Sequence, residues 1–201
     1  MTATKSAAPN GWITAGSHPD SYEMSLFTEF SHSGTRCARL RSTRQIIDGF
    51  GTLMQSVNAA GYRGKRIKLT AFIKSESVND WAGLWMRVDA GREFVSFDNM
   101  QNRAIRGDTD WTQYHVVLDV PEKSTNISFG VLLSGVGCLW LDDFELKVVG
   151  QEVPSTDTTV ATLGWSVAST DSPPDATDAQ KILTSAVDSV QASPEYATPP
   201  M

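Results

Sequence analysis

The sequence has few of the residues that mark specialised classes of protein. Only two of its 201 residues are cysteines, Cys37 and Cys138, and two widely spaced cysteines do not build the disulfide framework of a small secreted domain. We expect two separate core thiols, with a single bridge as the less favoured alternative. No apolar run approaches the ~20 residues of a membrane span, and the N-terminus has no apolar stretch typical of a signal peptide. These absences predict a cytoplasmic protein with no membrane partner.

An excess of positive charge is also missing. The chain has 17 Lys and Arg against 23 Asp and Glu, a net charge of -6, which favours neither a nucleic acid nor an anionic lipid as a partner. The common zinc, phosphate-binding and nucleophile motifs are absent, and His18, His32 and His115 stand apart without metal-ligand spacing. We therefore expect no cofactor, and a small molecule as the partner, with the oligomeric state left open.

What the sequence does contain is strand periodicity. Apolar and polar residues alternate in runs of five to nine between residues 10 and 150, and Gly, Asn, Asp and Pro separate the runs. The runs lie at 66–74, 80–89, 95–101, 114–120, 127–133 and 139–146. Many short strands with hardly any helical pattern predict an all-β protein, an antiparallel β-sandwich of the jelly-roll kind.

The composition divides the chain into three parts. Residues 1–9 are expected to be a flexible N-terminus, and residues 10–150 one ligand-binding domain. Residues 151–201 are rich in Ser, Thr, Asp, Ala and Pro, a composition that buries too little apolar surface to offset the entropy of ordering. We expect this third part to be a mostly disordered, low-complexity tail with at most one short helix.

The segment 80–89 carries the main candidate for a ligand site. Its residues alternate between two faces of a strand, and the face opposite the predicted core side carries Trp81, Trp85, Arg87 and Asp89 around Gly83. One interpretation is that these tryptophans pack under a loop or that the strand is buried on both faces. The other is a concave sheet face on which Trp81 and Trp85 stack against a ligand, Arg87 anchors it and Gly83 leaves room.

A neighbouring run adds polar groups to this candidate site. Asp98, Asn99 and Met100 interrupt an otherwise apolar strand, and Gln55 does the same in another, so each needs a partner or a cavity. If the protein is an enzyme, Asp98 is the predicted catalytic residue. Desolvation would raise the pKa of its carboxyl group toward neutrality, whereas a neighbouring Arg87 would lower that pKa.

One pair of acids suggests a metal. Asp142 and Asp143 are expected at the end of a strand, where paired carboxylates and backbone carbonyls form the ligand set of a structural calcium. A solvated strand end is the alternative.

Several segments together resemble a known type of domain. They include Asn10-Gly-Trp, Phe50-Gly-Thr-Leu-Met-Gln, Trp81-Ala-Gly-Leu-Trp-Met-Arg-Val-Asp, Phe97-Asp-Asn-Met and Phe129-Gly-Val-Leu-Leu-Ser-Gly. They resemble, in order, the ligand-binding domain appended to some bacterial AraC-type transcription regulators. The resemblance implies a galactose-binding or carbohydrate-binding-module-like jelly roll. The helix-turn-helix units of such regulators are not found in this sequence, so DNA binding is not carried over.

Two functions follow as hypotheses. The first is binding of an organic ligand, sugar-like or polycyclic, on the aromatic sheet face. The second is a cofactor-free cyclase or isomerase of secondary metabolism, similar to a pericyclase, that uses the same pocket to hold a reactive conformer and to stabilise positive charge on the indoles. Fold alone does not decide between them.

Overall fold

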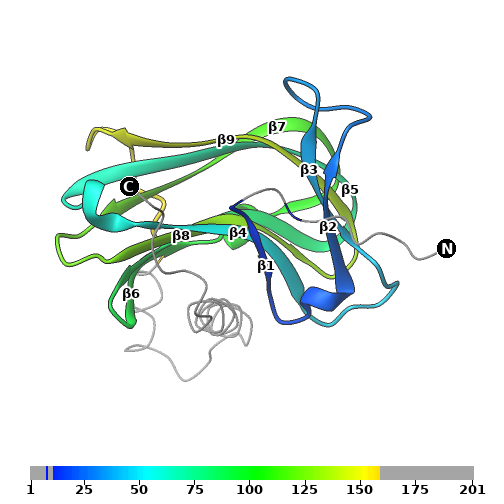
Figure 1. Cartoon of the computed structure of the whole chain (residues 1–201), viewed down its shortest axis with the longest axis horizontal. Coiled ribbons are helices and arrows are strands. Elements are labelled where there is room, and N and C mark those ends of the chain that lie inside the picture. Colours follow the sequence, from blue (N-terminus) through cyan, green and yellow to red (C-terminus); the bar gives the residue numbers. More distant parts are fainter. Residues whose placement is uncertain (1–7, 9–10, 159–201) are drawn as a thin grey trace.

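The computed structural model describes residue 8 and residues 11–158, which form an antiparallel β-sandwich of the jelly-roll type (Figure 1). The described residues contain nine strands and three 3₁₀ turns. They are β1 (Ile13–Ala15), η1 (Pro19–Ser21), β2 (Tyr22–Phe27), β3 (Cys37–Ser42), β4 (Phe50–Asn58), η2 (Ala59–Gly61), β5 (Lys65–Ala90), β6 (Glu93–Asp98), η3 (Gln101–Arg103), β7 (Ile105–Val120), β8 (Asn126–Ser134) and β9 (Cys138–Val149). Among these residues there is no helix with the length and apolar character that a membrane crossing requires.

The strands pair in the order β1-β4-β8-β5-β9-β3-β2, and β6 and β7 also pair with β5. Strand β5 belongs to both layers: its first half pairs with β7 and β9, and its second half pairs with β8 and β6. The runs predicted at 66–74 and 80–89 are therefore parts of one strand. The left-handed backbone of Ser77 (φ 54°) lies between the two halves. In Figure 1, β9, β7 and part of β5 form one layer, and β8, β4 and β6 lie in the other.

The main core fills the space between the layers. Strand β5 supplies Ile67, Leu69, Ala71 and Ile73 in its first half and Ala82, Leu84, Met86 and Val88 in its second, and all eight are completely buried. Alternate residues of β8, such as Ile127 and Val131, face them from the same cluster. The period of two that predicted the strands thus also identified their core faces.

The described chain runs past the boundary predicted at residue 150. The Thr156 N–H donates to the Val117 carbonyl (2.8 Å), and the Thr158 N–H donates to the Phe97 carbonyl (2.8 Å). These bonds join the segment after β9 to the edges of β7 and β6. The predictions for 1–7, 9–10 and 159–201 concern residues outside the described part of the chain.

Candidate functional site

The two predicted tryptophans share one face of β5 but are packed side chains. Trp81 and Trp85 alternate with the core residues of β5, so their indoles lie on the opposite face of the sheet, in a second apolar cluster with Phe50, Met54 and Phe97. Trp85 is completely buried and Trp81 is 8% exposed. The Trp85 Nε1–H donates to Thr52 Oγ1 (2.8 Å). In this structure the strand is buried on both faces, which was the alternative to an exposed platform.

The space at Gly83 is also taken. A Cβ atom at Gly83 would collide with the backbone carbonyl of Asn99, and it would lie 3.4 Å from the Trp81 ring. The glycine is therefore needed for the close passage of the chain after β6, not for ligand room between the two indoles.

Arg87 and Asp89 lie on the same face as the tryptophans and bind each other. The Arg87 Nε lies 2.8 Å from Asp89 Oδ1, and the side chains are 4% and 7% exposed. Asn126 Nδ2 donates to Asp89 Oδ2 (3.3 Å). The Arg87 Nη1 atom is buried and has no hydrogen-bond partner among the described residues, so both of its N–H donors are unused there.

Asp98 does not join this group. It is the register partner of Met86, whose side chain faces the main core, so Asp98 lies on the side of the sheet opposite Trp85. Its completely buried carboxylate accepts hydrogen bonds from Arg103 Nη2 (2.6 Å) and Nη1 (3.1 Å) and from the Met100 N–H (2.8 Å). The sequence predicted that Asp98 lines one cavity with Trp81 and Trp85, and this prediction is wrong because Asp98 lies on the other side of the sheet. The cation beside Asp98 is Arg103 rather than Arg87.

The remaining predicted residues are scattered. Gln55 is the register partner of Phe129, a core residue, so it lies on the face of β4 opposite Thr52. Met100 packs into the main core. Asn99 Oδ1 accepts from the Gln101 N–H (3.1 Å), which shapes the turn after β6. Trp81, Trp85, Arg87 and Asp89 therefore share the outer face of β5, whereas Gln55, Asp98 and Met100 lie on the main-core side of the sheet.

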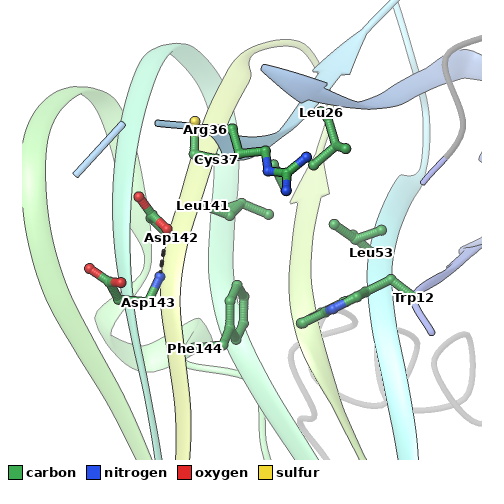
Figure 2. Close-up of a pocket in the computed structure, with 10 residues that line it drawn as sticks. Trp12, Leu26, Arg36, Cys37, Leu53, Leu141, Asp142, Asp143 and Phe144 are labelled. Atoms are coloured by element: carbon green, nitrogen blue, oxygen red, sulfur yellow. Dashed lines mark hydrogen bonds between the residues drawn. The ribbon is translucent and has the colours of Figure 1, made fainter. Parts of the chain in front are cut away.

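A different site opens between the two layers, beside the N-terminal segment (Figure 2). It is a cavity of about 200 Å³. Its apolar lining consists of Trp12, Leu26, Ala38, Leu53, Leu141 and Phe144, and its charged lining of Arg36, Asp142 and Asp143. The half-buried Trp12 ring meets Phe144 edge-on, with centroids 4.7 Å apart at 62°. Apolar walls with a few polar groups at the opening are typical of small-molecule sites.

The acid pair at this cavity holds a loop. Asp142 Oδ2 accepts from the N–H groups of His32 (2.9 Å) and Ser33 (3.1 Å). The Asp143 carboxylate contacts the His32 Nδ1 (2.7 Å) and accepts from the Ser33 Oγ–H (2.6 Å). The His32 ring is stacked on Phe72 with centroids 3.6 Å apart. These bonds fasten the β2–β3 connection, which carries Arg36, onto β9.

The position of the pair corrects the sequence expectation. Asp142 and Asp143 lie inside β9, not at its end, and Asp143 has a left-handed backbone (φ 50°) that is uncommon for a residue other than glycine. Such a backbone lets two successive carboxylates face the same loop. Among the described residues no group of three or more His, Cys, Asp or Glu side chains is arranged to hold a metal ion.

The acid pair makes a testable contribution to stability. The hydrogen bonds from Ser33 and then from His32 hold the pKa of Asp143 below its ordinary value. A carboxyl group whose pKa is lower in the folded state stabilises the protein above the unfolded-state pKa, and this stabilisation is lost as the pH falls through the folded-state pKa. Asp143→Asn should therefore unfold at lower urea than the wild type at pH 7, and the difference should shrink once the pH falls below about 3.9.

The matched control for this experiment is Asp48→Asn, because Asp48 is exposed. Its urea midpoint should stay close to that of the wild type throughout. A gap between Asp143→Asn and wild type that is unchanged between pH 7 and pH 2.5 would contradict the role assigned to the carboxylate.

Sequence reasoning missed three residues of this cavity region: Trp12, Arg36 and His32. They belong to the N-terminal segment and the β2–β3 connection. These segments have no strand periodicity from which the direction of a side chain could be predicted. Cys37 was noted only as a core thiol. It lines the cavity, and burial raises its pKa to about 11, so the thiol is protonated at neutral pH and is a weak nucleophile. Cys37 and Cys138 are both free, as expected.

Comparison with solved structures defines the class of protein as a jelly-roll domain. The chain resembles the enzymatically active domain of tailspike protein 4 from bacteriophage CBA120, with a TM-score of 0.55 and 12% identity over 70% of this chain and 20% of that chain. It also resembles the Stig cyclase Fisc from Fischerella sp. TAU (TM-score 0.52, 16% identity, 74% of this chain and 91% of that chain). A family 16 carbohydrate-binding module gives a TM-score of 0.51 and 19% identity over 73% of this chain and 97% of that chain. At these identities the likeness shows the fold alone.

One curated relative is much closer in sequence. The chain is 48% identical over 149 residues to the uncharacterized HTH-type transcriptional regulator YbfP of Bacillus subtilis (strain 168), a match that covers 73% of this chain. The chain spans about half the length of that relative. No protein-family model matches the chain. The relative is a helix-turn-helix regulator, which agrees with the predicted resemblance to a domain appended to such proteins.

Proposed function

We propose that this domain binds a small organic molecule in the cavity between its two layers. The observation that carries the proposal is the open cavity of about 200 Å³ with half-buried Trp12 against Phe144 on its wall. Elsewhere in the described core, large apolar side chains such as Trp85 pack against protein. At the cavity, Trp12 and Leu26 keep exposed surface, and Leu26 is 43% exposed. A ligand that covers these side chains removes their apolar surface from water, which favours binding.

The comparisons support a binding role without naming the ligand. In a helix-turn-helix regulator such as YbfP, a jelly-roll domain of this kind would be the part that senses an effector. The neighbours include a carbohydrate-binding module and a cyclase solved with an indole compound. The apolar lining of the cavity favours a compact, largely apolar molecule over a sugar, because sugar hydroxyls would lose hydrogen bonds to water there.

The geometry favours binding over acid catalysis. A cofactor-free cyclase that protonates its substrate needs a carboxyl group that is neutral near pH 7. Asp142 and Asp143 both accept hydrogen bonds from the loop, and the bonds from Ser33 and His32 lower the pKa of Asp143. They are better suited to holding the loop than to donating a proton.

Removing the aromatic wall should test this proposal. Trp12→Ala should lower the affinity for 2-naphthamide, an uncharged bicyclic probe, by tenfold or more, because a buried aromatic anchor commonly contributes ~2 kcal/mol or more to binding. Trp12→Phe should retain part of the affinity. Isothermal titration calorimetry measures both, and thermal melting shows that each variant is folded.

The control is Tyr62→Ala, which removes a half-buried aromatic ring at η2, outside the cavity. Its affinity for the probe should equal that of the wild type. If 2-naphthamide binds and Trp12→Ala leaves its affinity unchanged, the ligand lies elsewhere, and the face of Trp81, Trp85 and Arg87 becomes the candidate site.

A further inference from the structure

The charged side chains around the cavity differ in how many hydrogen bonds and ion pairs they form with the protein. Asp142 and Asp143 accept hydrogen bonds from His32, Ser33 and the Asp143 backbone N–H. In Figure 2 their carboxylates point away from Trp12. Arg36 is different, because its exposed side chain makes no ion pair or hydrogen bond within the part of the chain that the structure describes.

The placement of Arg36 directs its free donors at the cavity. The residue lies just before β3, at the end of the loop that the acid pair fastens to β9. Figure 2 shows its guanidinium group extending over the opening between Leu141 and Leu53. A guanidinium group offers five N–H donors in a planar fork that matches the two oxygens of a carboxylate.

We infer that the cavity takes a small aromatic or alicyclic anion, whose apolar body packs against Trp12 and whose carboxylate pairs with Arg36. The inference rests on the proposed binding function and adds the charge of the ligand. The body removes Trp12 and Leu26 surface from water. The carboxylate stays at the rim, where it remains partly hydrated and avoids the cost of burying an unpaired charge.

The overall negative charge of the protein opposes binding of an anionic ligand. An anion can therefore bind at the cavity only if a nearby cation, here Arg36, attracts it. The chain has a net charge of -6, and two of the three charged residues that line the cavity are acidic. The two carboxylates are stabilised by the hydrogen bonds that they accept from the loop. The guanidinium group of Arg36, in contrast, forms no ion pair with any described residue at the cavity. A ligand cation would meet Arg36 at the mouth, and a neutral ligand would leave its donors to water.

Three probes of one shape test the charge. They are 2-naphthoate, 2-naphthamide and 2-naphthylmethylamine, which carry a negative, a neutral and a positive group on the same ring system. Wild-type protein should bind the carboxylate about tenfold more tightly than the amide, as expected for one charge-assisted pair at a partly exposed site, and should bind the amine most weakly. The preference should decrease as salt is raised.

Arg36→Gln should remove the preference, so that carboxylate and amide bind with equal affinity, while affinity for the amide stays within about twofold of wild type. Arg44→Gln is the matched control, because Arg44 is an exposed arginine in the β3–β4 connection and does not line the cavity. It should keep the wild-type preference for the carboxylate.

The outcomes separate this inference from the proposed function. Binding of the amide or amine as tightly as the carboxylate, with loss on Trp12→Ala, would overturn the anion assignment and leave the cavity as the ligand site. A carboxylate preference that survives Arg36→Gln would assign the anion to another residue. If none of the three probes binds at millimolar concentration, both the inference and the proposed function fail.

Discussion

Replacement of Trp85 by alanine is expected to lower the free energy of unfolding by about 3–5 kcal/mol. The indole is completely buried on the outer face of β5, and its N–H donates to Thr52 Oγ1. Removing it leaves a large cavity and takes away the donor to Thr52 Oγ1, whose hydroxyl keeps its own bond to the Val131 carbonyl (2.9 Å). The surrounding strands relax only partly around such a gap. Urea unfolding monitored by circular dichroism measures the change.

Two variants place this result in context. Leu84→Ala removes a completely buried residue from the main core on the other face of the same strand, and should cost about 2–5 kcal/mol. Thr52→Val keeps the packing but removes both the acceptor of the indole N–H and the donor to the Val131 carbonyl, so about 1–3 kcal/mol is expected. If Trp85→Ala costs much less than Leu84→Ala and instead abolishes ligand binding, Trp85 is a ligand platform as first predicted, and its packed role is refuted.

A second large effect is expected at Asp98. Asp98→Ala should destabilise the protein by about 3 kcal/mol, near the lower end of the range for breaking a buried ion pair, because Arg103 is 34% exposed and can regain water. The loss also leaves the Met100 N–H without its acceptor. The variant should keep its affinity for 2-naphthamide, because Asp98 lies outside the cavity.

The control for Asp98 is an ion pair of similar distance at the surface. Lys74 and Asp110 are 3.0 Å apart, and Asp110 is 87% exposed. Asp110→Ala should leave the free energy of unfolding close to that of the wild type, because water screens this exposed pair. A loss of ligand affinity in Asp98→Ala, with stability unchanged, would restore the functional role that the sequence suggested for Asp98.

The fold was largely predictable because each strand shows a local alternation of apolar and polar residues. Ile67, Leu69, Ala71 and Ile73 were placed on one face from their spacing, and all are completely buried. The alternation also placed Trp81, Trp85, Arg87 and Asp89 together on one face. It could not tell an exposed face from a second buried one, because an apolar face is compatible with both.

The rest depended on long-range geometry. The pairing of β5 with β6 shifts register between Val88 and Asp89, and Asp98 lies opposite Met86, so its partner is Arg103 of the following turn. The cavity brings together Trp12, Arg36 and Phe144, which are far apart in the sequence. The periodicity within one segment cannot predict which distant segments come together. The adjacent acids Asp142 and Asp143 were nevertheless singled out from the sequence, and they line this cavity.

Strand β5 has a consequence for how the protein folds. It bonds to β6, β7, β8 and β9, all of which follow it in the chain, and its two halves belong to different layers. Neither layer can be completed before distant parts of the chain have met, which makes folding slow for a domain of this size. The same continuity prevents one layer from melting alone. Unfolding of residues 11–158 should therefore occur in one cooperative transition, with identical midpoints for fluorescence and circular dichroism.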